Sequence, residues 1–286
     1  MTVRVIPRLD IKGPNLVKGI HLEGLRVLGR PEDFAVHYYQ SGADELLYMD
    51  AVASLYQRNS LFDMVTRTAR EIYIPLTVGG GLRTLDDIRQ MLRSGADKVA
   101  LNTAAIKRPN LIKEAAHQFG SSTIVVSIEV IRKPDGSYEA YTNYGRDWTG
   151  LNALEWAVQA AELGAGELLI TSIGTEGTGK GYDLELTRMI AESVPIPVIA
   201  CGGAGSVEDV CDVVSQGKAD AVSAASIFHY DCFEQFQYQE QNLSGEGNIE
   251  FLRKNRTSAR LPGVTVQQVK QGMAEQGIAY RPFPNE

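Results

Sequence analysis

The chain has 286 residues, of which 44% are apolar and 22% are charged, and its formal net charge is −7. This composition is typical of a globular protein with a sizeable core and excludes an intrinsically disordered chain. The acidic balance, without lysine- or arginine-rich blocks, argues against nucleic acid and an anionic membrane as partners. Three cysteines are too few for a disulfide framework, and the N-terminus has no signal-peptide pattern, so we expect a cytoplasmic protein.

Short apolar stretches alternate with amphipathic stretches along the whole chain. The apolar stretches are continuous runs of Val, Ile and Leu, as expected of strands buried on both faces. The amphipathic stretches carry helix boundaries, with Pro31 and Gly42 around the first and Thr84 and Gly95 around another. The eight expected strands cover residues 4–10, 45–50, 74–79, 97–101, 123–129, 167–172, 196–201 and 219–224.

Eight strand-then-helix units predict an α/β fold, a (β/α)8 TIM barrel. The alternative, an open doubly wound sheet, lacks its usual G-x-G-x-x-G fingerprint after the first strand. The sequence also repeats itself at a spacing of 122 residues, because VGGGLRTLDDI begins at Val78 and ACGGAGSVEDV begins at Ala200. We therefore expect a single domain over residues 1–286, built from two similar half-barrels.

Glycines end matching strands in both halves, just before the next helix. Gly81 and Gly203 allow a ligand oxygen to approach the backbone N–H groups. Thr103 and Ser226, at the ends of the following strands, each add a hydroxyl. The pattern predicts two phosphate cradles half a barrel apart, and hence a substrate with a phosphate at each end. The alternative is that the glycines only form tight turns.

Two carboxylates stand where strands become loops, at the end of the barrel where active sites of this fold lie. Asp10 ends the first strand and Glu129 ends the fifth, so the two groups should face each other across the barrel. Such a pair suits general acid–base chemistry. The alternative is a salt bridge with Lys18 or Arg132. Lys18, in the loop expected after the first strand, could instead attract a phosphate.

The glycine-rich segment of residues 174–183 follows the sixth strand. Glu176 and Gly177 could reach the second phosphate region from it, and the alternative is a flexible loop. The four histidines show no metal-ligand spacing, so we expect no metal site.

These motifs resemble those of the HisF family, the cyclase subunits of imidazole glycerol phosphate synthase in histidine biosynthesis. The resemblance covers residues 4 to about 230 and rests on LDIKGPNLVKG, GADELLYMD, IPLTVGGG, GADKVALNTAA, GAGELLITSI, GTGKGYD, CGGAG and AASIFHY. Several of these stretches are shared with the HisA isomerases, but GAGELLITSI favours HisF.

The resemblance implies a barrel that receives ammonia from a HisH-like glutaminase subunit docked at its base. The ammonia would pass through the barrel and react with a bisphosphate substrate, a phosphoribulosyl-formimino aminoimidazole carboxamide ribonucleotide. The products would be imidazole glycerol phosphate and an aminoimidazole carboxamide ribonucleotide, and no cofactor is implied.

The resemblance also assigns individual residues. The two catalytic acids correspond to Asp10 and Glu129. Phosphate and substrate contacts correspond to Lys18, Gly81, Asn102, Thr103, Gly177, Gly203 and Ser226. The charged gate at the base corresponds to Arg4, Glu45, Lys98 and Glu167, and the glutaminase-facing side includes Asp97. For these last five residues the alternative is a stabilising network of ion pairs.

The chain departs from the family at several positions. Glu129 and Glu176 replace aspartates, and Cys201 replaces a serine. The polar stretch 230–263, between the last strand and the last helix, is much longer than in HisF, and is expected to be a lid, a partner contact or a disordered insertion. These departures favour an alternative function, a HisF-like subunit that channels ammonia for amidation of a bacterial surface sugar. A HisA-like sugar-phosphate isomerase and a binding-only module are weaker alternatives.

Overall fold

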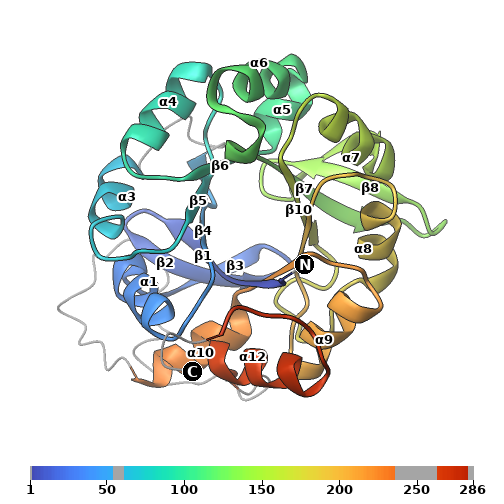
Figure 1. The fold of residues 1–286 in the computed structure, drawn as a ribbon. Coiled ribbons are helices and arrows are strands. Elements are labelled where there is room, and N and C mark those ends of the chain that lie inside the picture. Colours follow the sequence, from blue (N-terminus) through green and yellow to red (C-terminus); the bar gives the residue numbers. More distant parts are fainter. Residues whose placement is uncertain (1, 54–60, 236–262, 283–286) are drawn as a thin grey trace.

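A computed structural model describes residues 2–53, 61–235 and 263–282. Eight parallel strands close into a barrel, which Figure 1 shows end-on, with helices around it. The barrel strands are β1 (Arg4–Lys12), β4 (Leu46–Asp50), β5 (Leu76–Gly79), β6 (Lys98–Leu101), β7 (Ile124–Arg132), β10 (Glu167–Ser172), β11 (Val198–Cys201) and β12 (Ala221–Ala224). Each strand pairs with the next, and β12 pairs with β1, which closes the sheet. The predicted TIM barrel is confirmed.

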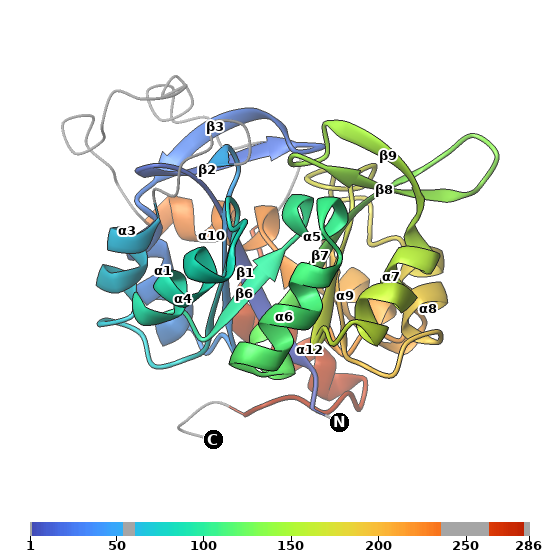
Figure 2. The same cartoon turned by 90° about the horizontal axis from the view of Figure 1, so that it is seen from above.

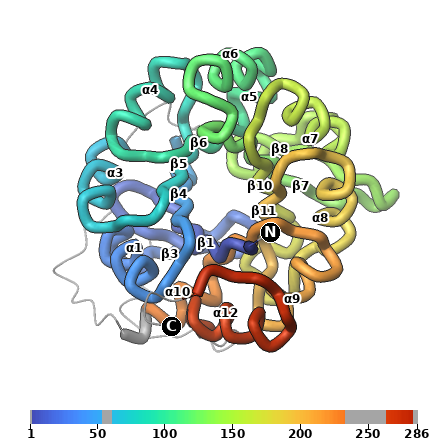
Figure 3. Tube along the Cα trace, viewed as in Figure 1, coloured from blue at the N-terminus to red at the C-terminus, as the bar shows by residue number. Residues whose placement is uncertain are grey.

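The helices lie outside the barrel, as the chain trace in Figure 3 shows. They are α1 (Pro31–Gln40), α3 (Phe62–Thr68), α4 (Leu85–Arg93), α5 (Thr103–Lys107), α6 (Asn110–Phe119), η1 (Ser121–Thr123), α7 (Ala153–Glu162), α8 (Leu184–Ala191), α9 (Val207–Ser215), α10 (Ser226–Gln235) and α12 (Val266–Glu275). The expected boundaries are present. Thr84 and Asp87 form a capping box on α4, and the Ser206 hydroxyl accepts a hydrogen bond from the Asp209 N–H on α9. Among the described helices, none is long and apolar enough to cross a membrane.

Two antiparallel hairpins, which the sequence pattern did not predict, extend the barrel at one end. They are β2 (Asn15–Ile20) with β3 (Glu23–Gly29), after β1, and β8 (Tyr138–Thr142) with β9 (Asp147–Asn152), after β7. Figure 2 shows both hairpins at the end opposite the N-terminus. The expectation that a loop follows the first strand was therefore wrong, because β1 continues to Lys12 and pairs with β2.

Both hairpins follow equivalent strands of the two half-barrels, so the duplication extends into them. Their turns share an unusual backbone: His21 and Leu22 have φ values of 53° and 63°, and Asn143 and Tyr144 have 54° and 61°. The two pairs lie at the same spacing of 122 residues as the sequence repeat, since 143 − 21 = 122.

Buried apolar side chains of the described residues form three clusters. The largest packs the outer face of the barrel against the helices, and a second lies within the barrel. The third includes Leu22 and Tyr144, one from the turn of each hairpin. The long polar stretch 230–263 begins inside α10, and its residues 236–262 lie outside the described residues. The expectations for that stretch therefore remain predictions.

Candidate active site

Alternate residues of each barrel strand face the lumen, the interior of the barrel. On β1 this alternation selects Arg4, Ile6, Arg8 and Asp10, in order from the base of the barrel to its mouth. The lumen accordingly has a charged ring at the base, then an apolar layer, then a polar layer around Arg8, then Asp10. The apolar cluster comprises Ile6, Leu47, Met49, Ala100, Val125, Leu169, Ile199, Cys201 and Ala221.

Asp10 is 1% exposed and is surrounded by cations. Its Oδ1 accepts a hydrogen bond from Arg8 Nε at 2.9 Å, and its Oδ2 lies 3.9 Å from Lys18 Nζ. Oδ2 has no hydrogen-bond partner among the described residues. Of the two salt bridges considered from the sequence, the structure thus contains the one between Asp10 and Lys18, and Asp10 Oδ2 is buried without a hydrogen bond from the described residues.

Glu129 is equally buried but has a different environment. Its Oε2 accepts a hydrogen bond from the Gly145 N–H at 2.8 Å, at the turn that follows β8. Burial raises the pKa of Glu129 to about 7, although Arg8 and the Gly145 N–H act in the opposite direction. The anticipated salt bridge between Glu129 and Arg132 is absent, because Arg132 pairs with Glu185 instead. A carboxyl with a pKa near neutrality suits proton transfer.

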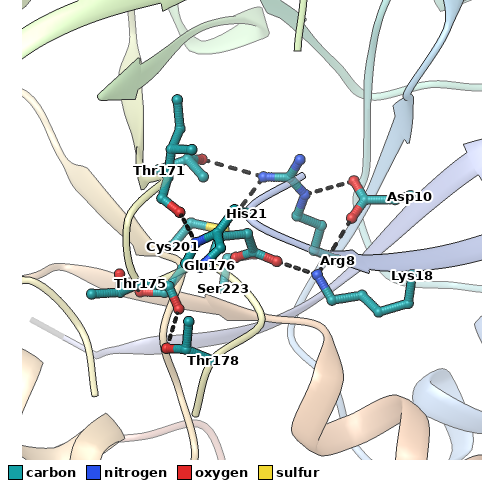
Figure 4. A network of polar contacts seen from close by, with 12 residues as sticks. Arg8, Asp10, Lys18, His21, Thr171, Thr175, Glu176, Thr178, Cys201 and Ser223 are labelled. Atoms are coloured by element: carbon teal, nitrogen blue, oxygen red, sulfur yellow. Dashed lines mark hydrogen bonds and ion pairs between the residues drawn. The ribbon is translucent and has the colours of Figure 1, made fainter. Parts of the chain in front are cut away.

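Lys18 lies between Asp10 and Glu176. It forms an ion pair with Glu176, which comes from the segment after β10, and it approaches Asp10 (Figure 4). Burial lowers the pKa of Lys18, but Glu176 and Asp10 outweigh burial and raise it above its ordinary value. Arg8, Asp10, Lys18 and Glu176 therefore form one chain of alternating charges across the mouth of the barrel.

The first predicted phosphate cradle opens onto a cavity of about 370 Å³. Gly81, Asn102 and Thr103 all line this cavity, which also reaches Glu129. The Thr103 hydroxyl accepts a hydrogen bond from the Asn143 N–H at 3.0 Å, so the β8–β9 turn closes one side. The basic side chains of the wall were not anticipated from the sequence; they are Arg83, Lys107 and Arg108.

The second predicted cradle is covered. Gly203 and Ser226 are both buried, and the Gly181 N–H donates a hydrogen bond to the Gly203 carbonyl at 2.9 Å. The Thr175 hydroxyl binds the neighbouring Gly202 carbonyl at 3.0 Å. Gly177, in the same segment as Thr175 and Gly181, packs closely against β2. A Cβ added to Gly177 would lie 2.6 Å from the carbonyl oxygen of Gly19. The segment of residues 174–183 therefore lies between β2 and the second cradle.

The four gate residues form a closed ring at the base. Glu45 lies 2.7 Å from Arg4 and 3.0 Å from Lys98, and Glu167 lies 3.1 Å from Arg4 and 3.0 Å from Lys98. Burial lowers the pKa of Arg4, but the two glutamates outweigh burial and raise it. The structure thus brings together all four residues, with alternating charge around the ring.

Asp97 does not join this ring. Its Oδ2 accepts a hydrogen bond from the Leu76 N–H at 2.9 Å, at the start of β5. Asp44 and Asp220 make the same kind of bond to Val5 and Val198, at 2.8 and 2.9 Å. This recurrence supports a structural role for Asp97 in holding adjacent strands together.

Arg8 is the residue of the site that the sequence analysis missed. Its guanidinium is 1% exposed, and its Nη1 lies 3.2 Å from Thr171 Oγ1 and 3.5 Å from Cys201 Sγ (Figure 4). The signal was its spacing of two residues from Asp10, because residues i and i+2 of a strand share one face. Burial raises the pKa of Cys201, so this thiol is not an activated nucleophile.

The described residues contain no group of histidine, cysteine or acidic side chains that could hold a metal ion. Cys201, Cys211 and Cys232 are free and buried.

Comparison with known proteins gives a consistent result over most of the chain. A family described as "Histidine biosynthesis protein" matches residues 4–234. The "Imidazole glycerol phosphate synthase subunit HisF" of Legionella pneumophila is 56% identical over 207 residues, which cover 72% of this chain and 98% of that protein. The subunit of the same name from Alkaliphilus metalliredigens (strain QYMF) is 49% identical over 231 residues, which cover 81% of this chain and 92% of that protein.

Proposed function

The chain belongs to the histidine biosynthesis protein family and, within it, to the HisF proteins, and we propose that Asp10 and Glu129 carry out its acid–base chemistry. It is an enzyme, the cyclase subunit of imidazole glycerol phosphate synthase. One observation supports the assignment of the site most strongly: two buried carboxyls face the lumen from opposite strands, and a cavity lined by basic side chains reaches one of them, Glu129. The raised pKa of Glu129 supports a role in moving protons near neutral pH.

The substrate assignment follows from the two cradles. One phosphate of the phosphoribulosyl-formimino aminoimidazole carboxamide ribonucleotide is assigned to Gly81, Asn102 and Thr103. The cavity there is of a size typical of small-molecule sites, and Arg83 and Lys107 give it positive charge. The other phosphate is assigned to the surroundings of Gly177, Gly203 and Ser226. Lys18 lies against Asp10 and Glu176, and it is assigned to the reacting part of the substrate.

The partner is a HisH-like glutaminase subunit, and we assign its docking site to the base of the barrel. The word "subunit" in the names of both relatives supports a partner, and the charged ring supports a gate at this end. Ammonia would pass the ring and then cross the apolar layer, which favours the neutral molecule over ammonium because burying a charge is costly. We assign the complex to the cytoplasm, which three free cysteines suit.

The geometry supports a simple division of steps. Ammonia adds to the substrate carbonyl above the lumen, and proton transfers let water leave and an imine form. The imine nitrogen then bonds to the formimino carbon, which closes the imidazole ring, and the bond from that carbon to the aminoimidazole carboxamide ribonucleotide breaks as the departing amine takes up a proton. Asp10 and Glu129 are on opposite sides of the lumen, so one can accept a proton while the other donates one. Glutamate is longer than aspartate by one methylene, and the hydrogen bond from Gly145 fixes where the Glu129 carboxyl lies.

Steady-state turnover of the bisphosphate substrate by the purified chain, with an ammonium salt at high pH and no partner, tests this function. We expect formation of imidazole glycerol phosphate. Binding of the substrate without turnover would overturn the assignment of the reaction, and would point to a HisF-like subunit that delivers ammonia to another acceptor, such as a surface sugar.

A further inference from the structure

Arg8 places a permanent positive charge inside the barrel, directly against one of the two proposed catalytic acids. Its Nε lies 2.9 Å from Asp10 Oδ1, and its Nη1 reaches Thr171 on the far strand β10. The side chain is 1% exposed, so water screens this interaction very little. The guanidinium stays charged, because Asp10 and other neighbours raise its pKa well above the ordinary value despite burial.

Within the described part of the chain, Glu129 has no ion pair of this kind: Arg8 lowers its pKa without a direct bond, and burial outweighs that effect. Among the described residues, the contact that the structure gives to its carboxyl is the hydrogen bond from the Gly145 N–H. Two like carboxylates that face one lumen disfavour each other's ionised form, and a cation beside one of them decides which stays ionised. Arg8 is bonded to Asp10 and not to Glu129.

We infer that Arg8 is a positioning residue that keeps Asp10 as the ionised member of the pair and leaves Glu129 as the member that carries the proton. Asp10 then accepts a proton from the substrate while Glu129 donates one, so the number of protons on the pair is unchanged. This inference rests on the acid–base roles proposed above, and it explains why a charged side chain occupies the lumen beneath them.

The other charged and titratable groups around the pair do not replace Arg8. Lys18, from β2, is bonded to Glu176, so much of its charge is compensated. Burial raises the pKa values of Tyr144, in the turn after β8, and Cys201, on β11, so both are neutral at pH 7. Tyr144 also interacts with Asp10, but it brings no positive charge. Arg146, in the same turn as Tyr144, acts on Glu129 only weakly and is exposed.

The test is a titration of the carboxyl groups of the free chain by infrared spectroscopy, which needs no substrate. Near pH 6 exposed carboxyls are ionised, so the band of protonated carboxyls reports buried groups. We expect a band in the natural chain that Glu129→Gln removes. In Arg8→Met a second band should appear, because the cation that favours the ionised form of Asp10 is gone and the like charge of Glu129 remains. That band should be missing from the double variant Arg8→Met/Asp10→Asn.

Matched variants separate charge from packing. Arg8→Lys keeps the cation and should titrate like the natural chain. Arg8→Gln keeps hydrogen-bond donors without charge and should behave like Arg8→Met, which also serves if Arg8→Met does not fold. Arg132→Met, an exposed position on β7 outside the site, should change nothing. Unchanged carboxyl bands in both neutral variants of Arg8 would overturn the inference.

Activity provides a second readout. With the concentration of unprotonated ammonia held constant, the acid limb of the pH–rate profile of Arg8→Met should move to higher pH, because the proposed base has lost its neighbouring cation. A lower rate with an unshifted profile would contradict the inference and indicate a packing role. If the carboxyls titrate as expected but no variant turns over the substrate, the proposed function fails and the assignment of charges stands.

Discussion

The two half-barrels share a sequence pattern, but they differ in the partners of their acids and in the accessibility of their phosphate cradles. In the first half, Asp10 is paired with Arg8, and the cradle at Gly81 opens onto the cavity of about 370 Å³. In the second half, Glu129 is bonded to a backbone N–H, and the segment after β10 covers the cradle at Gly203. The backbone positions were duplicated, but access and charge depend on the loops and on side chains that differ between the halves.

The largest effect on turnover is expected from replacing Asp10. Asp10→Asn should lower turnover by roughly 10²–10⁴-fold, the range usual for loss of general acid–base catalysis, with little change in binding of the bisphosphate substrate. Steady-state kinetics and calorimetric binding measure the two quantities. Asp86→Asn, an exposed carboxylate on α4, is the control and should retain full turnover. Near-full turnover by Asp10→Asn would remove Asp10 from the chemistry.

Glu129 should affect how the free energy of unfolding depends on pH. Its pKa of about 7 exceeds the ordinary value, so the folded chain binds this proton more tightly than the unfolded chain. The stabilisation is therefore complete at low pH and is lost as the pH rises from about 4.5 to about 7, by about 3 kcal/mol. Glu129→Gln cannot ionise, so it should be more stable than the natural chain at pH 8 and similar to it at pH 4. Urea unfolding at both pH values measures this, and a difference independent of pH would contradict the account.

Replacing a glycine in each of the two cradles should have a smaller effect, and the loss of stability should differ between them. Gly203 has φ of 114°, and an added Cβ would collide with the Gly181 carbonyl, so Gly203→Ala should cost roughly 1–3 kcal/mol of unfolding free energy. Gly81 has φ of 74° and lines the open cavity, so Gly81→Ala should cost about 1 kcal/mol. Thermal unfolding of the two variants compares them directly. Equal losses would show that the cover over the second cradle is not tightly packed.

The sequence was sufficient for the elements that repeat. Continuous apolar runs predicted the eight strands, and glycines and acids at their ends predicted the contents of the mouth. The hairpins were missed because each begins as a continuation of a barrel strand, and the strand pattern of β7 does not stop at Glu129. The signal for the second hairpin was Asn143 and Gly145 in its turn, residue types that tolerate positive φ.

Other features could not be read from the chain because they depend on distant contacts. The cover over Gly203 depends on hydrogen bonds from residues 174–183, whose glycines alone are equally compatible with an open loop. The spacing of Arg8 from Asp10 indicates only that the two share one face of the strand, whereas the burial of Arg8 depends on contacts from other strands. Its partners Thr171 and Cys201 lie more than 160 residues away.

The most direct test of the account is a crystal structure of the Asp10→Asn variant with the bisphosphate substrate bound. The account predicts one phosphate at Gly81 and Thr103, the other at Gly203 and Ser226, and the reacting carbonyl between position 10 and Glu129. A substrate that binds with only one phosphate in a cradle, or with its carbonyl out of reach of Glu129, would contradict the claim that the two halves of the barrel act together on one molecule.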